Sequence, residues 1–277
     1  MTSAKNLFVI TSFLFFSVNG AISQTTAEDY VRIAEEFKKK AQPDSAIFYY
    51  EKAAGIFQSQ SATGKFINAC NQVGVLLTRQ DKYEAAKAYL NKALSAGLTL
   101  PDTASLDLAS TYIGFGVICN AEKDYATSLF YHNKSLAIRL AKLGEYHSDV
   151  ATSYGNIGNV YLNARDYDRS IEAHLKAMRT REKLFGKTSV EIAQSYTGLG
   201  NAYREKKDYQ QSVDYFQKAL QNKIIQLGQG HKDLVRYYTN ISEVYYLMNN
   251  RKDGDFYKGK SEEISKPALL LQPGSKN

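Results

Sequence analysis

The sequence has 277 residues, of which 44% are hydrophobic and 23% charged, and this balance is typical of a folded chain and excludes a disordered one. The formal charge of +7 permits an acidic partner, but Lys and Arg alternate with Asp and Glu along the chain, so no clustered basic patch indicates nucleic-acid binding. Four prolines, 21 tyrosines and no tryptophan predict long helices that use tyrosine as the large packing residue.

Residues 1–23 are predicted to be a signal peptide. One charge, Lys5, precedes the apolar stretch Leu7–Val18, and the small residues Ala21 and Ser23 occupy the −3 and −1 positions of a cleavage after Ser23. This stretch is shorter than the roughly 20 residues that a membrane-spanning helix needs, although an uncleaved N-terminal anchor is the alternative. No cysteine lies nearby for lipid attachment. The sequence therefore predicts a periplasmic or secreted protein without a stable membrane span after cleavage.

A repeat of 42 residues runs through the rest of the chain. Three segments align without gaps and begin 42 residues apart: Tyr154–Tyr161, Tyr196–Tyr203 and Tyr238–Tyr245. Two further series keep the same spacing: Tyr83, Tyr125, Tyr167 and Tyr209, and Gly144, Gly186 and Gly228. Self-similarity at a fixed period of this length indicates stacked structural repeats.

Each repeat is predicted to form two helices. In the first, Tyr154, Ile157, Gly158 and Tyr161 share one face, which must be buried. The glycine costs up to about 1 kcal/mol of helix propensity relative to alanine, so its recurrence predicts close approach by a neighbouring helix. The second helix is predicted to begin at an aspartate N-cap, to contact the first helix through small residues and to end at the glycine series. The caps are Asp124, Asp166 and Asp208, and the small residues include Ala86, Ser128, Ser170 and Ser212.

This residue order resembles the tetratricopeptide repeat, and the long period is similar to the repeats of kinesin light chains. Arg181–Gly186 and His147–Ala151 stand at the turns of that pattern. The resemblance covers residues 27–265 and implies an all-α fold, a right-handed superhelical α-solenoid of stacked antiparallel helix pairs. About five pairs would precede a degenerate capping unit in which Ser242 replaces the glycine, and residues 266–277 would form a short tail.

The cysteines and histidines are expected to have structural roles. Cys70 and Cys119 are too far apart in neighbouring helices for a disulfide, and we expect both to be buried as small hydrophobic residues. Packing or helix capping is expected for the four histidines, because His132 and His174 share the slot that Phe216 fills in the next repeat, and His147 and His231 stand at helix starts. No catalytic or metal-ligand motif occurs, so we expect no enzyme activity, cofactor or metal.

The resemblance also implies a binding surface on the inside of the superhelix. The family's concave positions correspond to Asn71, Val75, Ile113, Val117, Asn159, Asn201, Arg204, Arg236, Glu243 and Tyr246. Asn159 and Asn201 resemble part of a carboxylate clamp for peptide C-termini, but Gly155, Thr239 and Glu243 stand where its basic residues would be, so that clamp is not expected. These polar residues either solvate the face or pair with an extended peptide backbone; side-chain amides favour the second interpretation.

The predicted function is that of an exported, non-catalytic scaffold that binds a protein or peptide, with Arg204 and Arg236 attracting an acidic ligand. The alternative is a sensory or partner-docking component of a bacterial signalling system, since repeats behind a signal peptide look like the N-terminal regions of certain membrane-anchored histidine kinases. Leu269–Leu271 is too brief for a membrane span, so a signalling role would need a separate membrane partner. The sequence leaves open whether the concave or the convex face binds.

Overall fold

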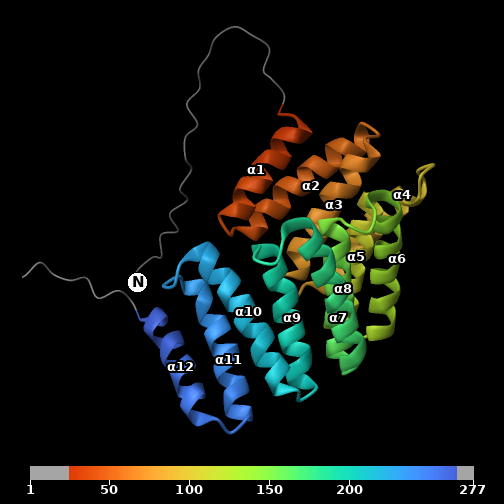
Figure 1. Ribbon diagram of the computed structural model, residues 1–277. Helices are drawn as coiled ribbons and strands as arrows, with labels where there is room; N and C mark the ends of the chain where they lie inside the picture. The colour runs from red at the N-terminus through yellow and green to blue at the C-terminus, as the bar shows by residue number, and fades with distance from the viewer. Residues whose placement is uncertain (1–24, 267–277) are drawn as a thin grey trace, which may run out of the picture.

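The computed structural model describes residues 25–266, so the predicted signal peptide and nearly all of the predicted tail lie outside the described residues. Within this range the chain forms twelve α-helices and one short 3-10 helix, and no strand (Figure 1). The helices are α1 (Ala27–Lys39), α2 (Pro43–Ser59), α3 (Thr63–Thr78), α4 (Tyr83–Leu98), α5 (Leu106–Ala121), α6 (Tyr125–Leu143), α7 (Ser148–Asn163), α8 (Tyr167–Phe185), α9 (Val190–Glu205), α10 (Tyr209–Leu227), η1 (Lys232–Leu234), α11 (Val235–Leu247) and α12 (Arg251–Ser265).

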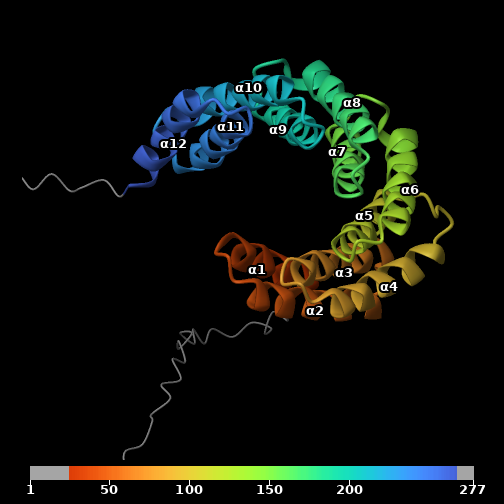
Figure 2. The same cartoon turned by 90° about the horizontal axis from the view of Figure 1, so that it is seen from below.

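Consecutive helices pack as pairs, from α1 with α2 to α11 with α12, and each pair packs against the next. Figure 2 shows the pairs following an open arc, in which first helices such as α7, α9 and α11 lie on the inner side and second helices such as α8, α10 and α12 on the outer side. The predicted all-α solenoid of stacked helix pairs is therefore confirmed. The concave face is built from the first helices.

The recurrent glycine of each first helix makes room for a large side chain of the second helix. A Cβ added at Gly158 would lie 2.7 Å from Nε2 of His174, and one at Gly200 would lie 2.6 Å from the ring of Phe216. The predicted close approach is confirmed, and with it the packing role of the histidines. The same arrangement recurs in four pairs: Gly74 with Leu90, Gly116 with His132, Gly158 with His174 and Gly200 with Phe216.

A buried hydrogen bond accompanies three of these four contacts; in the pair of Gly74 with Leu90 the equivalent residue is Ala86, which has no hydroxyl. The hydroxyl of Ser170 donates to the main-chain carbonyl of Gly158 at 2.8 Å, and Ser128 and Ser212 make the same bond in their own pairs. In the last pair the two residue types exchange helices, because Ser242 of α11 donates to the carbonyl of Gly254 of α12 at 2.8 Å. The unit that departs from the sequence pattern therefore keeps the contact.

The helix ends follow the predicted capping. The carboxylates of Asp124, Asp166 and Asp208 accept hydrogen bonds from the main-chain N–H groups of the first turns of α6, α8 and α10. Each of these helices ends at a glycine with positive φ, which a residue with a side chain rarely adopts; these are Gly144, Gly186 and Gly228 at +80°, +83° and +82°. His147 and His231 accept from the main-chain N–H groups of Asp149 and Asp233, as helix caps.

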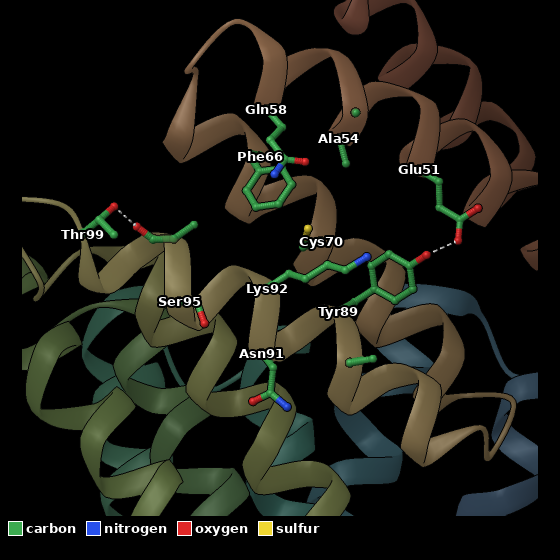
Figure 3. Close-up of a pocket in the computed structure, with 13 residues that line it drawn as sticks. Glu51, Ala54, Gln58, Phe66, Cys70, Tyr89, Asn91, Lys92, Ser95 and Thr99 are labelled. Atoms are coloured by element: carbon green, nitrogen blue, oxygen red, sulfur yellow. Dashed lines mark hydrogen bonds between the residues drawn. The ribbon is translucent and has the colours of Figure 1, made fainter.

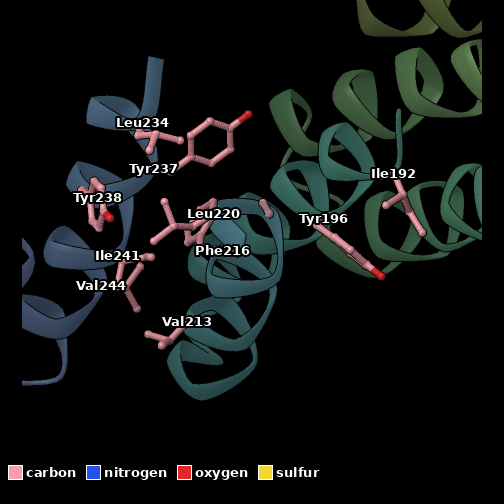
Figure 4. Packing of buried hydrophobic residues seen from close by; sticks show 11 residues of the cluster. Ile192, Tyr196, Val213, Phe216, Leu220, Leu234, Tyr237, Tyr238, Ile241 and Val244 are labelled. Atoms are coloured by element: carbon pink, nitrogen blue, oxygen red, sulfur yellow. The ribbon is translucent and has the colours of Figure 1, made fainter. Parts of the chain in front are cut away.

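The core runs through the whole stack and ends at α12. In the last two pairs Phe216 and Ile241 are fully buried between α10 and α11, together with Val213, Leu220 and Val244 (Figure 4). Only Gly254 and Ser261 of α12 are buried, and its exposed side chains are mostly charged or polar, with Phe256 as an exposed aromatic exception. Cys70 is buried and Cys119 partly buried, and both are free thiols within the described range.

Candidate functional site

A pocket of about 300 Å³ lies on the concave face, where α7, α9 and α11 come together. The first helices contribute mainly polar and small side chains, and α8 contributes two residues from below. The lining residues are Thr152, Gly155, Asn156, Asn159, His174, Arg181, Gln194, Thr197, Gly198, Asn201, Arg236 and Tyr237. This pocket brings three of the predicted site residues together, namely Asn159, Asn201 and Arg236.

The two asparagines stand at equivalent positions of α7 and α9, with Asn159 exposed and Asn201 half-buried. Neither side-chain amide takes part in a hydrogen bond within the part of the chain that the structure describes. Each amide offers a donor and an acceptor, the combination that the backbone of an extended peptide requires. Gly155, on the same wall of the pocket, has nothing within 4 Å of the position that its Cβ would occupy. This wall is therefore open to a ligand.

Arg181 of α8 is a buried cation beneath the pocket, with a relative exposure of 7%. Its Nη1 donates to Oγ of Ser195 at 2.6 Å and its Nη2 to Oε1 of Gln194 at 3.4 Å. No carboxylate lies within 4.0 Å of this guanidinium among the residues from 25 to 266. Burial lowers the pKa of Arg181 below its usual value, an effect that the charge of Glu191 opposes. The positive charge is thus desolvated without a partner of opposite charge in contact.

His174 lies beside Arg181 and is 3% exposed. Its ring occupies the space between Gly158 of α7 and Gly198 of α9. Its Nε2 is buried without a hydrogen-bond partner. Burial, and secondly the charge of Arg181, lowers the pKa of His174 to about 4, so the ring is neutral near neutral pH.

Arg236 of α11 supplies a second, exposed cation at the rim of the pocket. Its Nη2 donates to the hydroxyl of Tyr237 at 2.7 Å, and its guanidinium lies 4.7 Å from the centre of that ring. It forms no ion pair with any residue of the described chain. The cation–π contact orients the side chain and leaves the charge available to an acidic group.

Three other predicted site residues, Asn71, Arg204 and Glu243, have partners within the chain. The amide of Asn71 donates to the carbonyl of Asp107 at 3.0 Å and accepts from the hydroxyl of Thr111 at 2.9 Å, so it joins α3 to α5 and is not free for a peptide. Arg204 lies 3.2 Å from the carboxylate of Glu243, and this partly exposed ion pair would compete with an acidic ligand for the charge of Arg204.

The other predicted residues lie outside the pocket. Val75 and Val117 are exposed on the first helices α3 and α5, and Ile113 is half-buried beside them. Tyr246 packs its ring over Gly254, and its hydroxyl donates to Asp255 at 2.6 Å. These residues extend the first-helix surface on either side of the pocket without forming a second polar site.

Among the pocket residues that the sequence interpretation missed are Arg181 and His174, because the family's binding positions were taken from first helices alone. A signal for Arg181 was present. Arg139 and Arg181 are one repeat apart, as are their hydrogen-bond partners Ser153 and Ser195, so a buried arginine recurs opposite a serine.

A larger pocket, of about 720 Å³, lies between α2 and α4 and over α3 (Figure 3). Its three charged or phenolic groups contact one another, because the hydroxyl of Tyr89 donates to Glu51 at 2.5 Å and the ammonium of Lys92 lies 4.5 Å from the centre of the Tyr89 ring. Burial raises the pKa of the Cys70 thiol on its floor to about 11, so that thiol is unreactive near neutral pH. The concave pocket is therefore the better candidate site.

Neither a metal centre nor a membrane helix is found within residues 25–266. No group of three or more His, Cys, Asp or Glu side chains is placed to hold a metal ion there. None of the described helices is both long and apolar enough to span a bilayer.

Comparison with known proteins identifies the repeat. Models of the tetratricopeptide repeat match residues 67–141 and 149–225, and a further one matches residues 28–59. No curated protein gives a significant match to the sequence.

Three solved structures illustrate the likeness of fold. BtubC (BKLC) from P. vanneervenii has a TM-score of 0.68 at 17% identity, covering 94% of this chain and 96% of its own. A tetratricopeptide repeat protein from Parabacteroides merdae has a TM-score of 0.58 at 15% identity, with 87% and 80% covered. Aspartyl phosphate phosphatase F from Bacillus subtilis has a TM-score of 0.62 at 16% identity, with 91% and 62% covered. At these identities the likeness concerns the fold alone.

Proposed function

Because the chain belongs to the tetratricopeptide repeat family, whose fold serves as a protein–protein interaction scaffold, we propose that it is an exported, non-catalytic scaffold that holds an extended segment of a partner protein on its concave face. The observation that supports this proposal is the pocket between α7, α9 and α11, where the free amides of Asn159 and Asn201 lie on one wall. Amides in this arrangement can hold the main chain of a segment without dictating its sequence.

The size of the effect can be worked out from the two amides. Each net hydrogen bond contributes about 0.5 to 1.5 kcal/mol, so the loss of both should weaken binding by roughly five- to a hundredfold. Removal of Asn159 and Asn201 should leave folding intact, because no hydrogen bond of the described chain depends on either side chain.

The test begins with crosslinking and affinity capture to identify the partner. Titration calorimetry then compares the parent with the double variant Asn159→Ala and Asn201→Ala. A matched control is the double variant Asn91→Ala and Asn133→Ala, which removes two exposed amides, also one repeat apart, from the outer helices α4 and α6. Loss of binding in the first variant alone supports the concave site. Loss in the control alone would place binding on the convex face. Capture of a histidine kinase or response regulator would favour the alternative role in signal transduction.

The proposal of export rests on the sequence of residues 1–23, in which one positive charge, a short apolar stretch and small residues precede the cleavage point. Expression of the full chain in a bacterium, followed by fractionation and mass spectrometry, tests it. The expected product begins at Gln24 and is found in the periplasm or the medium. An intact Met1 terminus in the cytoplasm would contradict export.

A further inference from the structure

We propose that the concave pocket is a carboxylate subsite, in which a Glu or Asp side chain of the bound partner pairs with the buried guanidinium of Arg181. The inference rests on the proposed function, because the carboxylate is carried by the segment that lies in the groove. It adds to the proposed function the chemistry of the bound group and names Arg181, which lies in α8, the second helix of its pair.

The first argument is the isolation of the charge. A buried cation destabilises a protein unless an anion or several hydrogen bonds compensate it. Arg181 donates to two neutral side chains, Ser195 at 2.6 Å and Gln194 at the long distance of 3.4 Å. A guanidinium has five N–H groups in a planar fork that matches a carboxylate, so an acidic side chain entering from the pocket supplies the partner that is lacking.

The second argument comes from the equivalent residue one repeat earlier. Arg139 of α6 is equally buried and donates to Oγ of Ser153 at 3.0 Å, but it also donates to the main-chain carbonyl of Asp149 at 2.9 Å. Arg139 does not line the pocket. Of these two equivalent arginines in successive repeats, Arg139 therefore has a main-chain partner, whereas Arg181 faces a space that could hold a ligand group.

The third argument is the composition of the pocket. None of its twelve lining residues is acidic, and two of them, Arg181 and Arg236, are cations. Elsewhere on the same face the chain provides its own counter-charge, as Glu243 does for Arg204. His174, in the same lining as Arg181, adds a buried Nε2 without a partner. Charge complementarity thus favours an anionic group, and the amides of Asn159 and Asn201 supply neutral donors around it.

The test uses two blocked peptides of about eight residues, one alternating Glu with Thr and the other Gln with Thr, so that only the side-chain charge differs. Titration calorimetry with the full chain should show that the Glu peptide binds about tenfold or more tightly than the Gln peptide, the effect of one charge-assisted hydrogen-bonded pair. Arg181→Met should abolish this preference. The matched control Arg139→Met should keep it.

A second variant guards against loss of folding in Arg181→Met. Gly155→Leu narrows the pocket from α7, and its Cβ has room, because nothing lies within 4 Å of that position. It should lose binding of the Glu peptide while its circular dichroism matches that of the parent.

Four outcomes overturn the carboxylate subsite: equal binding of the two peptides, no binding of either at millimolar concentration, loss of the preference in Arg139→Met, or retention in both pocket variants. Binding of a single amino acid is tested separately with N-acetylglutamic acid α-amide, which keeps the side-chain carboxylate. If it binds as tightly as the Glu peptide, the pocket is a small-molecule site and not a peptide subsite. Equal binding of the two peptides would leave the proposed scaffold function intact, since the asparagine variants test that function against the captured partner.

Discussion

Two glycines of α7 that lie close together, Gly155 and Gly158, should respond in opposite directions to the same substitution. Gly158 faces the second helix, and an added Cβ would lie 2.7 Å from Nε2 and 2.8 Å from Cδ2 of His174. The ring cannot withdraw, because a Cβ position at Gly198 on its other side is already 2.5 Å from Nδ1. Gly155 faces the groove and has nothing within 4 Å.

The magnitudes follow from these contacts. Overpacking of a fixed core typically destabilises by about 1 to 3 kcal/mol, whereas alanine gains up to about 1 kcal/mol of helix propensity over glycine. Gly158→Ala should therefore lower the free energy of unfolding by about 1 to 2 kcal/mol. Gly155→Ala should raise it by about 0.5 to 1 kcal/mol, because only the propensity term acts there.

Urea unfolding followed by far-ultraviolet circular dichroism measures both variants against the parent. The slopes of the three transitions must agree for the midpoints to be compared, since repeat arrays can lose cooperativity. If Gly158→Ala is as stable as the parent, His174 is not wedged between the two glycines. If Gly155→Ala is the less stable variant, the groove wall is not open, and the concave pocket would have to be abandoned as a site.

The remaining predictions concern the histidine slots and the helix ends. Burial lowers the pKa of His132 and His174 to about 4. Below about pH 6.5 these two histidines therefore bind protons in the unfolded chain but not in the folded chain. The free energy of unfolding should fall as the pH drops from about 6.5 to 4. His174→Phe, which introduces the residue type that Phe216 supplies in the next pair, should reduce this dependence of stability on pH. Urea unfolding near neutral pH and at about pH 5 measures it. An unchanged pH dependence would contradict the prediction. Asp166→Ala removes the cap of α8 and should lower the melting temperature, at a cost of about 1 kcal/mol, which a fully retained temperature would refute. Gly186→Ala, at a φ of +83° and a ψ of +168° that essentially only glycine adopts, should cost about 1 to 3 kcal/mol by urea unfolding although no atom lies within 4 Å. A stabilised variant would disprove this backbone conformation.

The repeat could be predicted from the sequence because its strongest constraints are single residue types. A glycine at the helix contact, a serine opposite it and an aspartate at the next helix start each have few substitutes. The last pair shows where this reasoning fails. Ser242 was interpreted as a departure from the pattern, but it keeps the hydrogen bond between the paired helices by donating to the carbonyl of Gly254, because either helix can supply the hydroxyl. A periodic comparison does not detect an exchange between helices.

The sequence analysis also did not predict that each turn between paired helices contains a residue with positive φ. Lys123, Arg165 and Lys207 precede the capping aspartates with φ values of +65°, +62° and +68°. No glycine marks these positions, so the sequence carries no visible signal. The hydrogen bond from the following main-chain N–H to a carbonyl at the end of the first helix, as from Asp166 to Tyr161 at 2.9 Å, stabilises the turn despite the side chain.

The candidate site was predicted in part for a related reason. Position within the repeat identified Asn159, Asn201 and Arg236, since those residues must lie on the inner face. Position does not reveal which side chains the neighbouring repeat already uses. The amide of Asn71 occupies the same face, but Thr111 of the next first helix stands at hydrogen-bonding distance from it. Availability depends on pairs of residues in adjacent repeats, and so it requires the three-dimensional structure.

The location of the pocket follows from the same packing slots that hold the solenoid together. In the described chain, two second-helix side chains meet a glycine on both neighbouring first helices: Leu90, between Gly74 and Gly114, and His174, between Gly158 and Gly198. Above His174 the concave face is recessed, because glycines and not larger residues flank its ring. Near Leu90 the amide of Asn71 is bonded to α5 and is not free for a ligand. Above His174 the amides are free and a buried arginine lies beneath, so one slot of an otherwise uniform stack acquires the means to bind an acidic segment.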